Sequence, residues 1–214
     1  RKVILSLAVQ GHLVPTTGSK WEYHPLETIA ETIVDCPHST PKWTDKGRIC
    51  VRTNQFKPGV LDLSNPRFVS EETFRERIQR LRPKEGDVLY SREGGILGIA
   101  CRIPQNAVLC LGQRMMLIRS GPLLDSAFLE LVLNSPSITE IARRETIGGA
   151  APHVNVSTVR AYPIPLPALA EQQLIVAKVN ELMRWCDALE TRLATAQTTA
   201  ATLLDATLHQ ILAA

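Results

Sequence analysis

The last quarter of the sequence constrains the fold most, because it fits a single long helix. After Pro167 the chain contains neither glycine nor proline up to Ala214. A helix over this segment would be about 70 Å long at 1.5 Å per residue. Its apolar and small residues recur at alternating steps of four and three, which is the spacing of a coiled-coil seam. The seam consists of Ile175, Val179, Leu182, Cys186, Leu189, Leu193, Ala196, Ala200 and Leu203.

A seam of this length needs a second helix, because a small domain is narrower than the helix is long. The chain offers no second helix of this length, so we expect an isolated unit to form an antiparallel homodimer through the seam. The segment that leads into the helix carries Pro163, Pro165 and Pro167. Because proline fixes φ and lacks a backbone donor, we expect a stiff joint here rather than a strand of a sheet.

The charge distribution favours a nucleic acid as partner of the rest of the chain. The net charge of the 214 residues is +3, but the segment from Glu171 onward carries −2 and the preceding residues carry +5. Most of these basic residues are arginines, whose planar fork suits phosphates and the guanine edge. A basic surface that meets only solvent is compatible with the same charge.

Cysteine usage and hydropathy predict a cytoplasmic protein without membrane contact. No cysteine belongs to a C-x-x-C pair, so we expect reduced, buried thiols and no metal site. No apolar run reaches the ~18 residues of a membrane helix, and no signal peptide opens the sequence. The cysteines are Cys36, Cys50, Cys101, Cys110 and Cys186.

The residues between 16 and 162 predict an α+β domain with a mixed or antiparallel sheet and flanking helices, because strands and helices do not alternate strictly. Ser70 is a good N-cap, and glutamates follow it in the first turn. Glycines at 94, 95 and 98 predict a loose hairpin after a strand. The expected helices cover 26–32, 70–81, 125–133 and 137–144, and the expected strands cover 48–53, 88–91, 107–111 and 115–118.

The first residues look like the end of a second copy of the long helix. KVILSLAVQG has helical spacing and ends at Gly11, a suitable C′ glycine. When it is laid on the C-terminus, Leu5 falls on Leu208 and Val9 falls on Leu212.

Four segments together resemble one protein family. They are STPKWTDKG-RICVRTNQF, EGDVLYSREGGILGIA, GGAAPHVNVSTVRAYPIPLP and the opening of the long helix, PLPALAEQQ. In this order and spacing they are similar to the specificity subunits of type I restriction–modification systems. The resemblance covers essentially the whole chain. It implies the end of a preceding conserved helix at 1–15, a DNA target-recognition domain at 16–162, and a proline lead-in with a long coiled-coil helix at 163–214. Because such subunits repeat this unit, we expect a half-subunit or fragment.

The resemblance also implies a function without catalysis. The recognition domain would read one half of a bipartite target in double-stranded DNA. The helix would act as a spacer and as the docking site for methyltransferase subunits, which bring S-adenosylmethionine. Restriction and translocase subunits, which use ATP and Mg²⁺, would complete the enzyme, so this chain itself needs no cofactor.

Candidate DNA contacts are polar residues in loops and at strand ends, because phosphate contacts set the register and polar side chains read base edges. The candidates are Lys42, Arg52, Asn54, Gln55, Arg92, Gln113, Arg114, His153 and Asn155. Four further arginines fall within or just after the predicted helix 70–81, and we assign them to a solvated surface: Arg75, Arg77, Arg80 and Arg82.

Catalytic functions find little support in the sequence. Asn65-Pro66-Arg67-Phe68 lacks the second proline of the methyltransferase NPPY/F box, and no glycine-rich cofactor loop precedes it. No G-x-x-x-x-G-K-S/T loop is present, and the histidines have no metal-ligand spacing. A methyltransferase fragment is therefore disfavoured, whereas an adaptor that binds other proteins through the coiled coil stays open as an alternative.

Overall fold

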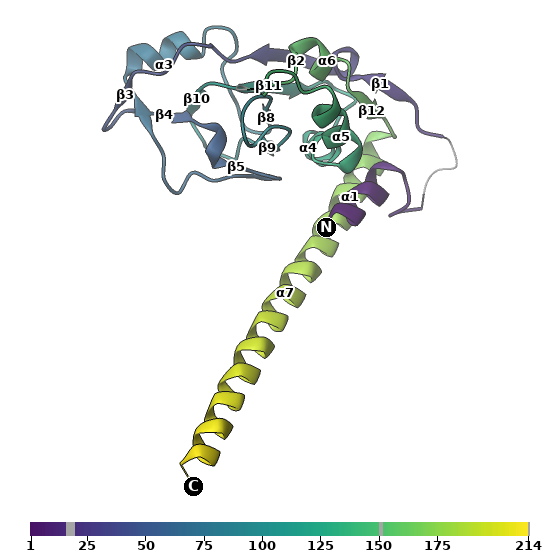
Figure 1. The fold of residues 1–214 in the computed structure, drawn as a ribbon. Helices are drawn as coiled ribbons and strands as arrows, with labels where there is room; N and C mark the ends of the chain where they lie inside the picture. The colour runs from purple at the N-terminus through teal and green to yellow at the C-terminus, as the bar shows by residue number, and fades with distance from the viewer. Residues whose placement is uncertain (16–19, 150–151, 214) are drawn as a thin grey trace.

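The predicted C-terminal helix is present in the computed structural model as α7, Leu169–Leu212, with 44 residues. Its length is about 66 Å at 1.5 Å per residue. The structure describes residues 1–15, 20–149 and 152–213. More than half of α7 projects beyond a head formed by the rest of the chain (Figure 1). The predicted domain boundary at residue 16 and part of the predicted loop around 150 lie outside the described residues.

Two four-stranded sheets form the head. The central sheet is antiparallel and has the order β2 (Ala30–Asp35), β11 (Met115–Ser120), β8 (Val88–Ser91) and β9 (Ala100–Arg102). The outer sheet has the order β10 (Leu109–Leu111), β4 (Arg48–Val51), β7 (Phe68–Val69) and β3 (Trp43–Thr44). Its β10–β4 pair is parallel, so this sheet is mixed. Two short antiparallel pairs are β1 (Tyr23–Pro25) with β12 (Pro163–Pro165), and β5 (Phe56–Lys57) with β6 (Val60–Leu61). The predicted α+β class is therefore confirmed.

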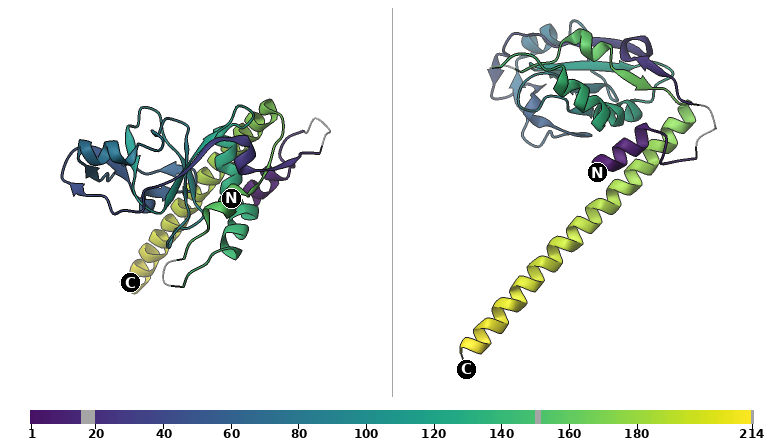
Figure 2. Two further views of the ribbon diagram at one scale, coloured as in Figure 1. Left: turned by 90° about the horizontal axis from the view of Figure 1, so that it is seen from above. Right: turned by 45° about the vertical axis from the view of Figure 1, so that its right-hand side comes forward.

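The sheets and helices are arranged in successive layers (Figures 1 and 2). Side chains that alternate along each strand pack against the layers on its two sides. In β8, Leu89 faces the outer sheet, whereas Val88 and Tyr90 face the helices on the other side. Those helices are α4 (Ser126–Leu133), α5 (Pro136–Arg144), α1 (Lys2–Val9) and the first turns of α7. On the opposite side, Phe74 of α3 (Glu71–Arg77) packs on Cys50 of the outer sheet. The short elements α2 (Leu26–Ile29), η1 (Thr53–Gln55) and α6 (Val156–Arg160) connect these layers.

The predicted cap at Ser70 is confirmed, whereas pairing across the sheets was not predicted. Ser70 caps α3 by accepting a hydrogen bond from the Thr73 N–H, and Asp125 caps α4. The predicted helix 26–32 ends at Ile29, because residues 30–35 form β2 and pair with β11. The strands β1, β3, β5, β6, β7, β9 and β12 and the helix α6 were not predicted either.

The first helix changes the expectation that no second helix is available. α1 lies beside the start of α7, with its N-terminus further along α7 than its C-terminus, so the two helices are antiparallel (Figure 2). Arg1 bridges Asp187 and Glu190, both at 2.6 Å. The eight residues of α1 cover only the first part of the seam. As predicted from KVILSLAVQG, this helix is followed by Gly11 at a positive φ of 77°.

The start of the predicted seam belongs to the core of the head. Ile175 and Val179 are each only 1% exposed and pack in the cluster that contains Phe128 and Leu129 of α4. The expectation that a helix partner, and not the domain, covers the seam is therefore wrong for these two positions. For the later seam positions, coverage by a partner helix stays a prediction.

The proline lead-in is also part of the head, contrary to our expectation of a separate joint. Strand β12 pairs with β1, and His24 lies opposite Ile164. Prolines fit here because the pair is isolated and short, so few ladder donors are needed. The first turn of α7 is tied down as well, because the buried Gln172 accepts a hydrogen bond from the Asp125 N–H and donates to the carbonyls of Leu123 and Pro167.

Candidate nucleic-acid interface

Five segments of the head meet at one edge of the two sheets, where several strands end or begin. β2, β4, β8 and β10 end there, and β11 begins there, because Met115 lies opposite Ser91 and Met116 lies opposite Asp35. The last residues of the parallel strands β4 and β10 also lie side by side. We call this edge the rim. The rim comprises residues 35–39, 52–55, 91–99, 112–114 and 152–155.

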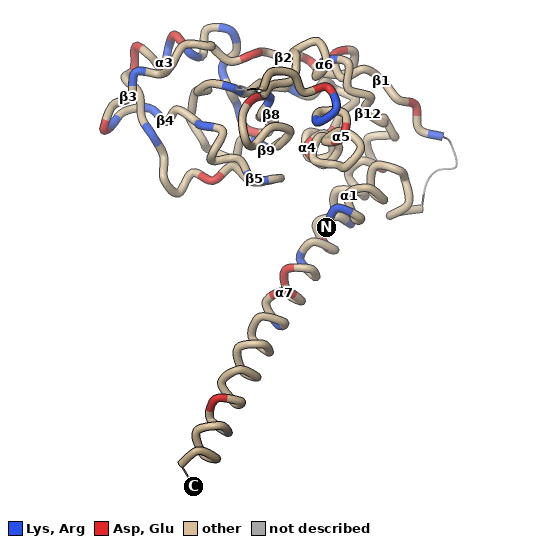
Figure 3. The backbone as a smooth tube through the Cα atoms, viewed as in Figure 1, with Lys and Arg blue, Asp and Glu red and all other residues tan. Residues whose placement is uncertain are grey.

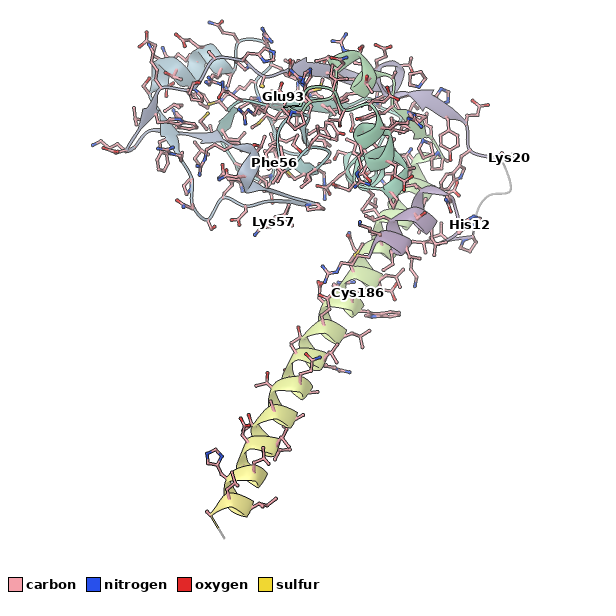
Figure 4. The ribbon with its side chains drawn as sticks, in the orientation of Figure 1. His12, Lys20, Phe56, Lys57, Glu93 and Cys186 are labelled. Atoms are coloured by element: carbon pink, nitrogen blue, oxygen red, sulfur yellow. The ribbon has the colours of Figure 1, made fainter. Side chains whose placement is uncertain are left out.

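Hydrogen bonds join these segments into one surface. The Gly112 N–H donates to the Val51 carbonyl at 2.8 Å, which ties segment 112–114 to the end of β4. The Arg92 N–H donates to the Arg114 carbonyl at 3.2 Å, and the Val154 N–H donates to the Arg92 carbonyl at 2.9 Å. Glu93, which marks the rim in Figure 4, lies far from Cys186 on α7. The rim is therefore a continuous surface, distinct from the long helix.

Eight of the nine predicted DNA contacts lie on the rim, and Lys42 does not. Lys42 precedes β3, in which Trp43 lies opposite Val69. Val69 also lies opposite Arg48, the first residue of β4, whereas the rim is at the other end of that strand. Lys42 is exposed, but at the opposite end of the outer sheet.

Arg92 stabilises the rim from inside, and its role in reading DNA stays a prediction that its burial does not favour. Its side chain is 7% exposed. Its guanidinium donates to both carboxylate oxygens of Asp35 at 3.0 and 2.9 Å and pairs with Glu93 at 2.9 Å. Burial lowers the pKa of Arg92, but the hydrogen bonds and charge of Asp35 outweigh it and the net direction is upward. Reaching a base would break this buried ion pair.

Gln55 also has a structural position, which does not favour its predicted contact with DNA. It is 5% exposed, and its Oε1 accepts a hydrogen bond from the Arg52 N–H at 2.9 Å. Its Nε2 donates to the Asp62 carbonyl at 3.1 Å. Both ends of the amide are therefore used to hold the turn η1.

The other six predicted residues on the rim are accessible to differing degrees. Asn54, Arg114 and Asn155 are exposed, whereas Arg52, Gln113 and His153 are half-buried. The Gln113 Nε2 donates to the His38 carbonyl at 2.6 Å. His153 lies opposite Glu93 in an isolated bridge. The Arg52 Nε is buried and has no hydrogen-bond partner among the described residues.

Arg77 has a role that the sequence analysis missed. It is 5% exposed, and its Nη1 donates to the carbonyls of Leu111 and Gly112, both at 2.9 Å. Its assignment to a solvated surface is therefore wrong: it connects α3 to the rim. Phe74 and Arg77 lie three residues apart on one helix face, and this spacing was the available signal. His38 was also missed, and its Nε2 lies 3.0 Å from Asp35.

The exposed part of α7 forms a second surface. Leu189, Leu193 and Leu203 are 64, 61 and 63% exposed. From Leu193 to the end of the chain Asp205 is the only acidic or basic residue apart from His209, and Figure 3 shows this nearly uncharged segment. Thr hydroxyls along the exposed part of α7 donate to the carbonyl four residues earlier, which leaves them satisfied within the helix: Thr191, Thr195, Thr198, Thr199 and Thr202. The surface is therefore more apolar than its composition indicates.

Neither a metal cluster nor a membrane helix is found in the part of the chain that the structure describes. No three His, Cys, Asp or Glu side chains there are grouped so that they would hold a metal ion. Among the described helices, none is long and apolar enough to cross a membrane.

Comparison with solved structures identifies the fold. The HsdS subunit from Thermoanaerobacter tengcongensis matches 89% of this chain with a TM-score of 0.61 and 20% identity. The S subunit of a type I restriction–modification system from M. genitalium matches 84% of this chain with a TM-score of 0.54 and 18% identity. The chain covers 45 and 42% of these two proteins, so it spans less than half their length.

Comparison of sequences identifies the family. The specificity subunit of the type I restriction enzyme EcoEI from Escherichia coli is 28% identical over 130 residues, which cover 57% of this chain and 22% of that subunit. The model of the type I restriction modification DNA specificity domain matches residues 20–196. Since this match includes both the head and the first part of α7, the chain belongs to the family of type I restriction modification DNA specificity domains.

Proposed function

We propose that the chain is the DNA-reading part of a type I restriction–modification specificity subunit, and that its rim recognises one half of a bipartite duplex target. One observation carries this proposal: polar side chains from several loops converge on one rim. The exposed members are Asn54, Arg114 and Asn155. Family membership and the net positive charge of the head support the same function.

The rim suits DNA because its accessible groups are of two kinds. Arg52 and Arg114 supply positive charge for phosphates or for guanine, and the amides of Asn54, Gln113 and Asn155 match adenine and other base edges. The buried bonds of Arg77 and Arg92 fix the segments beneath these groups. A fixed surface loses less conformational entropy when it binds, so its contacts discriminate better between sequences. Lys42 would contact only the phosphate backbone.

Enzymatic steps would belong to partner subunits. Methyltransferase subunits would bring S-adenosylmethionine and dock along α7, and restriction and translocase subunits would use ATP and Mg²⁺. The chain itself would work in the cytoplasm, where its DNA is found, and would need no cofactor. No observation on the head favours the alternative of a protein adaptor.

The outer part of α7 would pair with a second helix. In an isolated chain we infer an antiparallel homodimer centred near Ala200, because α1 already covers the first turns. Leu189 of one copy would then lie near Ile211 of the other, and the small residues Ala196 and Ala200 would allow close approach. The high exposure of the leucines and the lack of charge support this arrangement.

Selection from a random duplex library tests the DNA-reading function. The full chain should enrich a short sequence motif, and its affinity for the enriched duplex should fall steeply with salt, because each phosphate contact releases counterions. Arg75→Ala is a matched control, since Arg75 is exposed and pairs with Glu71 away from the rim. Enrichment of no motif by the wild-type chain would contradict the proposal.

A further inference from the structure

Arg114 has a backbone conformation that is unfavourable for an arginine. Its φ is +67°, and among the described residues the one other non-glycine with a positive φ is Asn106, at 61°. Asparagine tolerates this left-handed region, whereas for most L-residues the close approach of Cβ to the carbonyl oxygen costs stability. In the neighbouring loop the chain uses Gly94 and Gly98 at φ of 84° and 86°. A glycine would therefore fit position 114 better.

The surroundings impose this conformation on the backbone. The Arg114 carbonyl accepts a hydrogen bond from the Arg92 N–H, and the Arg92 side chain is held by Asp35. On the preceding side, Gln113 is tied to the His38 carbonyl, and on the following side the Met115 N–H donates to the Cys36 Sγ at 3.4 Å. Strain persists where the surrounding structure over-determines a residue, and such residues cluster at functional sites. None of these bonds requires an arginine side chain.

The side chain of Arg114 lies free on the rim. It is exposed, and it forms no ion pair with any residue that the structure describes. Its Nη1 lies 3.7 Å from the position that a Cβ on Gly94 would take, so the guanidinium lies next to the loop at Gly94. A free guanidinium fork is thus presented from a rigid, strained backbone, between segments 93–98 and 112–114.

We propose that Arg114 determines specificity for one guanine, by donating two parallel hydrogen bonds to its O6 and N7 in the major groove. The inference rests on the proposed function of the rim. A bidentate contact depends on orientation, which the fixed backbone supplies, and on the fork, which lysine lacks. The strain is retained because glycine at this position would remove the reading group.

The test uses the full chain and a random 30-base-pair duplex library, with thermal unfolding measured in parallel. Arg114→Gly should raise the Tm by about 2–4 °C, because it relieves the strain. From the library, the same variant should select the wild-type motif except at one G·C position, where it should accept any base pair. Arg114→Lys should leave the Tm unchanged and lose the preference for guanine at the same position by roughly 10-fold or more. Asn106→Gly, the matched control for a positive φ, should leave the motif intact.

The outcomes separate this inference from the proposed function. If Arg114→Gly and Arg114→Lys enrich the complete wild-type motif, Arg114 does not read a base and the inference is overturned. If Arg114→Gly loses affinity equally for every sequence, Arg114 contacts a phosphate and the inference is again overturned, although the rim still binds DNA. Only the failure of the wild-type chain to enrich any motif would overturn the proposed function together with the inference.

Discussion

Replacing Arg77 by alanine should destabilise the head and disorder the rim, although Arg77 itself does not face solvent. The change removes two buried hydrogen bonds, from Nη1 to the carbonyls of Leu111 and Gly112, and two partly buried ones from Nη2 to the carbonyl and hydroxyl of Ser39. Hydrogen bonds to a charged group contribute about 1.5–3 kcal/mol each. Part of this is offset because the variant no longer buries a guanidinium, so we expect the free energy of unfolding to fall by about 2–4 kcal/mol.

Urea denaturation followed by circular dichroism measures this loss. Arg75→Ala is the control, because Arg75 lies on the same helix but is exposed, and it should leave the midpoint unchanged within error. Hydrogen exchange should show faster exchange at the amides of 111–115 in Arg77→Ala. Equal midpoints for the two variants would refute the reasoning, since they would mean that the buried bonds contribute nothing net.

The remaining predictions concern the helix, the head and pH. Leu189→Asp with Leu193→Asp should leave a folded monomer by light scattering; an unchanged dimer mass would place the interface elsewhere. In a head swap between related subunits, a junction after Met183 should give a folded chimera that recognises the donor's half-site. A junction at 163–167 should give an unfolded chimera, because it takes β1 and β12 from different proteins. Equal folding of both chimeras would refute this. One heptad added to α7 within a matched pair should widen the gap between half-sites by about 10 Å without changing either one, as methylation mapping would show. Burial raises the pKa of Glu130 above its ordinary 4.5, so the folded state holds this proton more tightly than the unfolded state. The contribution of Glu130 to stability therefore falls as pH rises through the window above 4.5. Glu130→Gln should remove that decline in urea titrations at different pH, and an unaltered pH profile would contradict it.

Local signals in the sequence were sufficient to predict α3, α4, α5 and α7, but not α6. α7 was predictable because no glycine or proline interrupts it, and α3 and α4 because Ser70 and Asp125 are good caps. By contrast β2 was missed, because its residues follow directly on a helical turn and become a strand through pairing with β11. A single sequence carries no direct record of that partner.

The sequence was sufficient to name polar candidates for the rim, but not to say which of them are exposed on it. Arg114 and Asn155 were chosen because polar residues in loops are the usual readers of DNA, and both are exposed on the rim. The buried ion pair of Arg92 was not predicted, since its partner Asp35 lies 57 residues away in the sequence. Which arginines are buried depends on the register of five strands, and this is a property of the assembled fold.

The bonds of Gln172 have a consequence for the precision with which two half-sites can be spaced. They fix the base of α7 in the head, and the helix extends about 66 Å from that base. A rod of this length is a lever arm: a tilt of about 5° at the base displaces the far end by about 6 Å, close to the rise of two base pairs. If the base of α7 were less firmly held, a second recognition domain would therefore meet the DNA over a wider range of distances, even though every DNA-contacting residue stayed intact. The accuracy of spacing depends on a buried amide at the foot of the helix, and substitutions there should broaden the range of accepted gaps before they impair recognition of either half-site.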